Sequence, residues 1–195
     1  MTARARTRRP PPQDVAWEPG TVFTVGHSTL AISDFVALLS VYGIERLADI
    51  RTIPRSRRNP QFNADALPGS LAEAGIDYVA MQELGGLRHS RKDSPNTGWR
   101  NTSFRGYADY MQTDAFHRGL EKLIDLSRGK STAIMCAEAV PWRCHRSLVA
   151  DALIIRSIPV IEILSESSYR PHTLTPFAQV DGTQITYPPE QAQLL

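Results

Sequence analysis

The sequence predicts an α/β fold in three layers, with a mostly parallel sheet of about five strands flanked by helices and an irregular C-terminal tail. Short apolar runs alternate along the chain with longer segments in which apolar residues recur at helical spacing, and this alternation is typical of βαβ units. At 195 residues the chain is also long enough to bury one substantial core.

The expected strands are short apolar runs, and several are bounded by glycine or proline. Runs of this length favour buried strands over helices. The expected strands cover residues 21–26, 46–50, 76–80, 131–136 and 157–164.

Two helices are expected in the first half of the chain. Ser33 is a suitable N-cap for the first, and Gly43 is a suitable residue to follow its end. The second is expected over residues 64–74, interrupted or capped near Pro68.

The second half predicts two further helices, one long helix over residues 107–127 and another that begins at about Pro141 or Trp142. A polar stretch of about two dozen residues, 83–106, precedes the first of them. Connections of this length in a compact domain are usually functional or disordered.

We divide the chain into a disordered Arg/Pro-rich arm (1–20), a single α/β domain (21–165) and a C-terminal extension (166–195). The extension contains four prolines and is expected to be irregular, or to form a weak hairpin around Asp181 and Gly182.

The N-terminal arm carries basic residues without a following apolar segment, so it is expected to be neither a signal peptide nor a membrane span. Four of the 22 basic residues precede the first acidic residue, and the chain after them, with 18 basic and 20 acidic residues, is slightly acidic. The arm could contact nucleic acid or another polyanion, or it could be an unselective solvated terminus. Its arginines are Arg4, Arg6, Arg8 and Arg9.

Both cysteines of the chain lie in one stretch, MCAEAVPWRCHRSLV. Two cysteines provide no disulfide framework, and their closeness to His145 and Glu138 favours reduced thiols and a cytoplasmic protein.

Polar residues follow four of the expected strands. The carboxyl ends of parallel strands lie at one edge of a sheet, which is where open α/β sheets bind ligands, so these residues are expected to meet. They are His27 and Ser28 after the first strand, Asp49, Arg51 and Arg55 after the second, Glu83 and Gly85–Gly86 after the third, and Cys136 and Glu138 at the end of the fourth.

The Cys144-His145-Arg146 run is expected near the first turn of a helix. The positive end of the helix dipole and the neighbouring arginines would favour the thiolate of Cys144, a nucleophile or metal ligand. The guanidinium of Arg146, with free backbone amides, could instead hold a phosphate.

Other interpretations of these residues remain open. Cys136 could be a small core residue. A metal site made by Cys136, Cys144 and His145 has suitable atoms, but the paired CxxC spacing of strong zinc motifs is absent, so no metal ligands are assigned. His27 could be a general base, a phosphate contact or a residue that caps the sheet. The basic loop RSRRNPQFN suits nucleic acid, a phosphorylated ligand or plain solvation.

Five motifs in order, VGHST, DIRTIPRSRRNPQFN, GIDY with ELGG, FRGYADYM and CAEAVPWRCHRSLVADAL, resemble the family of domain of unknown function 488. The resemblance runs from about residue 22 to 163. It implies an α/β fold whose family-type residues group near one site, and it implies no cofactor. Some members carry a loose DNA-repair label. The residues so grouped are His27, Ser28, Asp49, Arg51, Pro54, Arg55, Cys136, Glu138, Cys144, His145 and Arg146.

Three functional hypotheses follow. The first is an enzyme acting on a phosphate-bearing or nucleic-acid-derived substrate, with arginines holding the anion, Cys144 or Cys136 as nucleophile or redox group, and His145, His27 or Glu138 moving protons. The second is a noncatalytic nucleic-acid-binding module that uses the arm and the basic loop. The third is a metal-binding protein. The cofactor and the oligomeric state are left unassigned.

Overall fold

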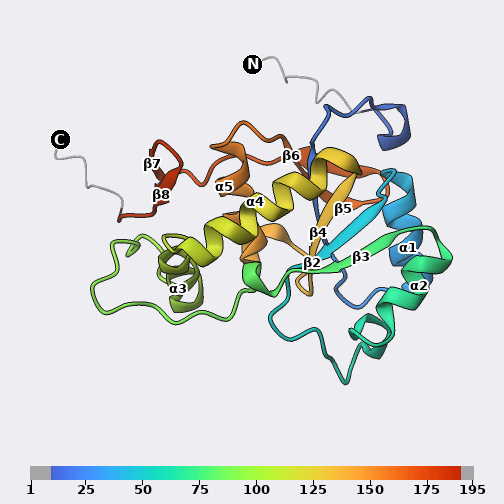
Figure 1. Ribbon diagram of the computed structural model, residues 1–195, viewed down its shortest axis with the longest axis horizontal. Coiled ribbons are helices and arrows are strands. Elements are labelled where there is room, and N and C mark those ends of the chain that lie inside the picture. The colour runs from blue at the N-terminus through green and yellow to red at the C-terminus, as the bar shows by residue number, and fades with distance from the viewer. Residues whose placement is uncertain (1–9, 190–195) are drawn as a thin grey trace, which may run out of the picture.

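The computed structural model describes residues 10–189, and in this part of the chain the fold is α/β, with a mostly parallel sheet of six strands in the order β3-β2-β4-β1-β5-β6 (Figure 1). The arginines of the expected arm lie outside the described residues. The sheet strands are β1 (Val22–Gly26), β2 (Arg46–Asp49), β3 (Asp77–Ala80), β4 (Thr132–Cys136), β5 (Val160–Ser165) and β6 (Ser168–Pro171).

All five expected strands are confirmed. Their pairing places the carboxyl ends of β1, β2 and β4, which carry polar residues, side by side. In register, Gly26 of β1 pairs with Cys136 of β4, and Asp49 of β2 pairs with Met135. The order of the strands and the antiparallel β6, which pairs with β5 at one edge, lie beyond what the sequence patterns predict.

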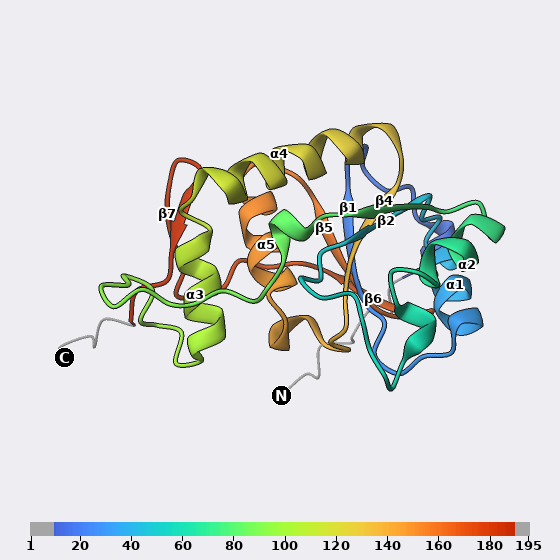
Figure 2. The same cartoon turned by 60° about the horizontal axis from the view of Figure 1, so that its bottom comes forward.

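Two helices cover one face of the sheet, and on the other side two helices pack against the sheet while a third lies beyond them (Figure 2). The first pair packs over a core that includes Phe35, Leu39 and Leu67, and the other three pack over a core that includes Leu120 and Leu148. The described helices are α1 (Ile32–Val41) and α2 (Leu67–Glu73) on the first face, and α3 (Thr102–Tyr110), α4 (Asp114–Gly129) and α5 (Arg146–Ile154) on the second.

The expected single helix over 107–127 is wrong, because the chain forms α3 and α4 with a break after Tyr110. Thr113 causes a new start, since its side chain accepts a hydrogen bond from the backbone N–H of Phe116. Ser33 is also not the N-cap of α1, because the helix begins at Ile32 after Ala31. Gly43 does follow the end of α1 with φ +63°, a conformation that favours glycine.

The chain between β4 and α5 is not one helix from Pro141. Residues Pro141–Arg143 form a short 3₁₀ turn, and α5 begins at Arg146. Cys144 therefore lies just before the helix, where the Ser147 hydroxyl donates a hydrogen bond to its carbonyl oxygen.

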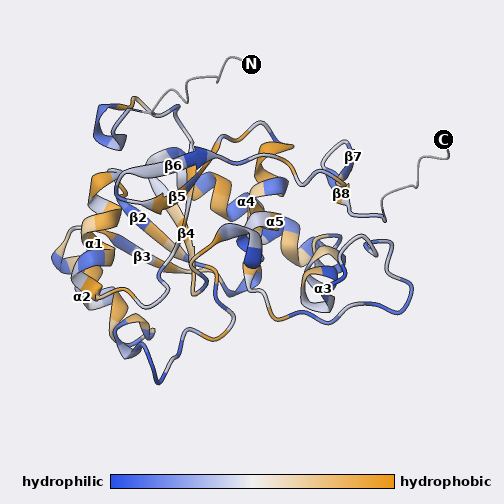
Figure 3. Ribbon diagram, turned by 180° about the vertical axis from the view of Figure 1, so that it is seen from behind, coloured by the Kyte–Doolittle hydropathy of each residue, from blue (hydrophilic) through white to orange (hydrophobic). Residues whose placement is uncertain are grey.

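The C-terminal segment forms the expected hairpin, made by β7 (Gln179–Asp181) and β8 (Gln184–Thr186). The hairpin lies at the α3 end of the molecule, far from α1 and α2 (Figures 1 and 2). The long polar connection after β3 extends around α3 and is mostly hydrophilic (Figure 3). Within residues 10–189, no helix combines the length and apolar character that crossing a membrane requires.

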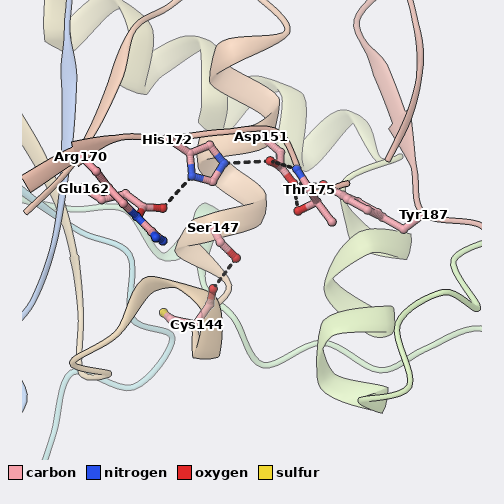
Figure 4. A network of polar contacts seen from close by, with 8 residues as sticks. All are labelled: Cys144, Ser147, Asp151, Glu162, Arg170, His172, Thr175 and Tyr187. Atoms are coloured by element: carbon pink, nitrogen blue, oxygen red, sulfur yellow. Dashed lines mark hydrogen bonds and ion pairs between the residues drawn. The ribbon is translucent and has the colours of Figure 1, made fainter. Parts of the chain in front are cut away.

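A buried polar network joins this C-terminal segment to β5 and α5 (Figure 4). The imidazole of His172 bridges two carboxylates, with Nδ1 2.7 Å from Glu162 Oε1 and Nε2 2.8 Å from Asp151 Oδ1. The hydroxyls of Thr175 and Tyr187 donate to the other oxygen of Asp151, at 2.7 and 2.9 Å.

Candidate thiol and arginine site

The loops after β1 and β4 are joined by backbone hydrogen bonds at the carboxyl edge of the sheet. The N–H of His27 donates to the carbonyl of Cys136, and the N–H of Ser28 donates to that of Ala137, both at 3.0 Å. Gly26 makes this closeness possible, because a Cβ there would clash with the carbonyl oxygen of Glu138.

A cavity of about 380 Å³ opens at this edge. Its wall combines two cysteines, an imidazole, a carboxylate, two guanidinium groups and two hydroxyls with an apolar side. The residues that carry these groups are Arg51, Thr52, Ser103, Cys136, Glu138, Arg143, Cys144 and His145, and the apolar side includes Ile53, Leu87 and Phe104.

The sulfur atoms of Cys136 and Cys144 are in direct contact and are paired as a disulfide. This pairing differs from the expectation of two reduced thiols. It arises because Cys136 ends β4 while Cys144 precedes α5, so the 3₁₀ turn between them folds the chain back to the same edge. Both residues are nearly buried, at 3% and 4% exposure.

The imidazole of His145 lies between Cys144 and the end of β2. Its Nε2 is 3.1 Å from the carbonyl oxygen of Ile50, and its Nδ1 is 3.6 Å from Cys144 Sγ. A carbonyl can only accept, so Nε2 carries the proton and Nδ1 presents a lone pair to the sulfur. Burial is the main cause that lowers the pKa of His145 to about 4, so the ring is neutral at pH 7.

Arg146 is completely buried, and its guanidinium donates hydrogen bonds to acceptors within the protein. It donates to the carbonyl oxygens of Val25, Glu138 and Ala139 and, from Nη1, to Cys136 Sγ at 3.0 Å. No carboxylate forms a salt bridge with it among the described residues, and it does not line the cavity. Burial lowers its pKa to about 10.

Arg51 is fixed by a buried ion pair with Asp49. The two side chains form a bidentate contact, with Nε to Oδ1 at 2.8 Å and Nη2 to Oδ2 at 2.6 Å. Arg51 Nη2 also donates to the carbonyl of Phe62, and the Tyr78 hydroxyl donates to Asp49. Arg51 therefore reaches the cavity as a rigid group that already has its counter-ion.

His27 lies behind Arg51 and outside the cavity wall. Its Nδ1 contacts the carbonyl of Ser28 at 2.9 Å, its Nε2 is 3.3 Å from Arg51 Nη1, and its ring stacks on Phe62. Because a guanidinium only donates, Nε2 is the acceptor and the ring is neutral. Burial, aided by the positive charge of Arg51, lowers the pKa of His27 to about 4, against the opposing Ser28 bond and Asp49 charge.

The other predicted residues lie around this centre. Ser28 has φ +47°, which turns the chain out of β1. The side chain of Glu138 is exposed at the cavity, whereas that of Arg55 is exposed on the neighbouring loop and does not line it. The edge thus brings together Arg51, Cys136, Glu138, Cys144 and His145, with His27, Asp49 and Arg146 packed behind them.

The family model of Domain of unknown function DUF488 matches residues 31–153, more than half of the chain. The chain belongs to this family. The match contains the cavity, while the residues of β1 and those of the His172 bridge to Glu162 lie outside it. No curated protein and no solved structure matches the chain.

Two residues have roles in the DUF488 site that the sequence patterns do not predict. Arg143 is expected only as a charge near Cys144, yet its exposed side chain lines the cavity, in the PWR run that precedes Cys144. Gly86 is the second, because a Cβ there would clash with Nδ1 of His145. The Gly85–Gly86 pair after β3 was the available signal, since paired glycines often mark close backbone approach.

A metal centre is not formed by the described DUF488 side chains: across residues 10–189, no three His, Cys, Asp or Glu residues group as possible ligands. The side chains that line the cavity carry sulfur, imidazole, carboxylate and guanidinium groups.

Proposed function

We propose that this DUF488 protein is an enzyme that binds a phosphate-bearing or nucleic-acid-derived substrate at the carboxyl edge of the sheet and acts on it with cysteine and histidine chemistry. One observation carries the proposal: a single cavity holds both cysteines, the imidazole of His145 and the guanidinium groups of Arg51 and Arg143. A nucleophile, a base and anion contacts in one cavity are the parts that such an enzyme needs.

Arg143 is the residue best placed to hold the anion. Its side chain is exposed and makes no hydrogen bond or ion pair within the described part of the chain, so its guanidinium is free for a bidentate contact with phosphate. The charge of Arg51 is largely compensated by Asp49, so it contributes mainly a fixed shape. This assignment replaces Arg146, which is enclosed by protein acceptors.

Cys144 and His145 supply a nucleophile and its base. The lone pair on His145 Nδ1 faces the Cys144 sulfur and can take the thiol proton as sulfur attacks. The exposed carboxyl group of Glu138 lies on the same cavity wall, where it can exchange a proton with the leaving group or with water. This chemistry requires the reduced state of the cysteine pair.

The apolar side of the cavity favours a substrate with more than a phosphate. Ile53 and Leu87 are 63% and 66% exposed, high values for large apolar side chains at a cavity rim. Together with the ring of Phe104, they offer a surface for a planar apolar group such as a nucleobase.

The experiment compares nucleoside monophosphate binding by calorimetry, and turnover of a panel of phosphate esters, in the reduced protein and three variants. R143E should weaken binding at least tenfold, while R57E, an exposed arginine outside the cavity, should leave it unchanged. C144S should bind normally and lose turnover. Equal binding by wild type and R143E, or unchanged turnover in C144S, contradicts the proposal.

A second candidate is a noncatalytic nucleic-acid-binding module. It is favoured by Arg55, Arg57 and Arg58, whose side chains are exposed and make no ion pair within residues 10–189. Phosphate contacts of this kind give affinity that falls steeply with salt. In this case R57E weakens binding of a DNA or RNA duplex and lowers its salt dependence, whereas C144S changes neither.

A further inference from the structure

We propose that Cys136 and Cys144 are also a reversible thiol–disulfide couple, in which Cys136 attacks a small-molecule disulfide and Cys144 completes the exchange. Their sulfur atoms are in direct contact, and both residues line the cavity. The couple uses the cavity of the proposed function, but it needs no phosphate-bearing substrate and can be tested without one.

The two sulfurs have different neighbours, which assigns their roles. Nη1 of Arg146 donates to Cys136 Sγ at 3.0 Å, so Cys136 has a cation at hydrogen-bond distance. The neighbour of Cys144 is the neutral imidazole of His145. Because a positive charge favours thiolate over thiol, Cys136 is the sulfur that attacks the external disulfide first, while Cys144 keeps its proton until His145 takes it.

The surroundings of Arg146 strengthen this assignment. The guanidinium is fully buried, and its other acceptors are the neutral carbonyl oxygens of Val25, Glu138 and Ala139. A buried cation is costly unless it is paired with an opposite charge. The Cys136 thiolate provides that charge at contact distance. Burial lowers the pKa of Arg146, and the more distant carboxylates of Glu162 and Glu138 do not fully offset this effect.

The exchange balances in two steps. First, the Cys136 thiolate attacks one sulfur of the external disulfide, forms a mixed disulfide and releases the other half as a thiolate. The Cys144 sulfur then attacks Cys136 and passes its proton to His145 Nδ1, which returns it to the departing thiolate. Two protein thiols are oxidised to one disulfide, and the external disulfide is reduced to two thiols.

The cavity offers the access that this reaction needs. Its volume of about 380 Å³ is within the range of small-molecule sites. Arg143 at the wall can contact carboxylates of the incoming disulfide, so oxidised glutathione is a suitable probe.

The test treats reduced wild-type protein, C136S and C144S with oxidised glutathione and measures intact mass after alkylation. Wild type should form the internal disulfide and keep no glutathione. C144S should accumulate one glutathione at Cys136, and C136S should react at least tenfold more slowly, because an ordinary thiol is only a few per cent thiolate at pH 7. Faster reaction of C136S than C144S overturns the roles, and no reaction in folded wild type overturns the couple.

A second measurement examines Arg146 without depending on its tolerance to substitution. The rate of iodoacetamide alkylation at pH 7 should be at least tenfold higher for C144S, which retains Cys136, than for C136S. If R146K gives a native circular dichroism spectrum, adding it to C144S should remove most of this advantage. Equal rates in the two single-cysteine variants contradict the Arg146 contribution. None of these readouts involves phosphate, so they fail independently of the proposed enzyme activity.

Discussion

His172 Nε2 lies 2.8 Å from Asp151 Oδ1, and this contact ties the segment after β6 to the helix that begins directly behind the cysteines. The other ring nitrogen contacts Glu162 of β5. Two carboxylate acceptors require two N–H donors, so the imidazole is charged. The C-terminal segment, which lies entirely beyond the DUF488 match, is thereby connected to α5 and the sheet.

The charged state of His172 predicts stability that is lost in alkali. Burial alone would lower its pKa, but the bonds to and charges of Asp151 and Glu162 raise it to about 9. The folded pKa exceeds the unfolded value, so the contribution is complete below pH 6.5 and disappears as pH rises through 9. Urea unfolding should show a loss of up to about 3 kcal/mol over this range.

The matched variant for this prediction is H172Q. It should be less stable than wild type at pH 6 and lose much less stability between pH 6.5 and 9, because the group that releases its proton is gone. An identical pH dependence in wild type and H172Q would show that the bridge is not charged.

Much of the fold could be predicted from the sequence because strand and helix patterns are local. The five parallel strands, the hairpin near Gly182 and the turn at Gly43 all follow from apolar period and glycine placement. The break between α3 and α4 could not be predicted from apolar spacing alone, because the spacing continues across it. Only the capping side chain of Thr113 marks it.

The parallel-sheet argument predicts that Cys136 and Glu138 meet Arg51 at one edge of the sheet, and these three residues line one cavity together with Cys144 and His145. The sequence does not predict which arginine is open to a ligand. Which arginine faces the ligand depends on tertiary burial: Arg143 is exposed, and Arg146, three residues later, is enclosed. Residue type and spacing do not distinguish these two environments.

Removing the partner of Arg51 is expected to destabilise the protein strongly. D49N leaves the guanidinium buried without its counter-charge, which typically costs about 3–5 kcal/mol. The pair Arg91–Asp93 is the matched control, because it has the same bidentate geometry and spacing but is exposed. D93N should hardly change the free energy of unfolding in urea. Equal effects of the two variants would mean that burial does not determine the cost.

Gly86 is expected to be necessary for the position of His145. G86A places a methyl group against Nδ1 of the imidazole, which must move away from Cys144 or push the loop out. Turnover should slow at least tenfold. The step that converts the mixed disulfide at Cys136 to the internal disulfide should slow by at least the same factor. G69A is the control, since no atom lies within 4 Å of its added Cβ. Unchanged thiol chemistry in folded G86A would remove His145 Nδ1 from that role.

The lowered pKa of His27 predicts that the protein loses stability in acid. Its folded pKa of about 4, lowered mainly by burial, is below the unfolded value of 6.5, so between these values the unfolded chain binds a proton that the folded chain does not. The free energy of unfolding therefore decreases as the pH is lowered from 6.5 to 4. H27Q should be less stable than wild type at pH 7 but should lose about 2 kcal/mol less between pH 6.5 and 4.5, as measured by urea unfolding. H89Q, at an exposed histidine, should behave as wild type. Equal losses of stability in acid for H27Q and wild type would contradict this prediction. They would mean that the pKa of His27 is the same in the folded and unfolded states, so that the bond from Arg51 does not keep the ring neutral.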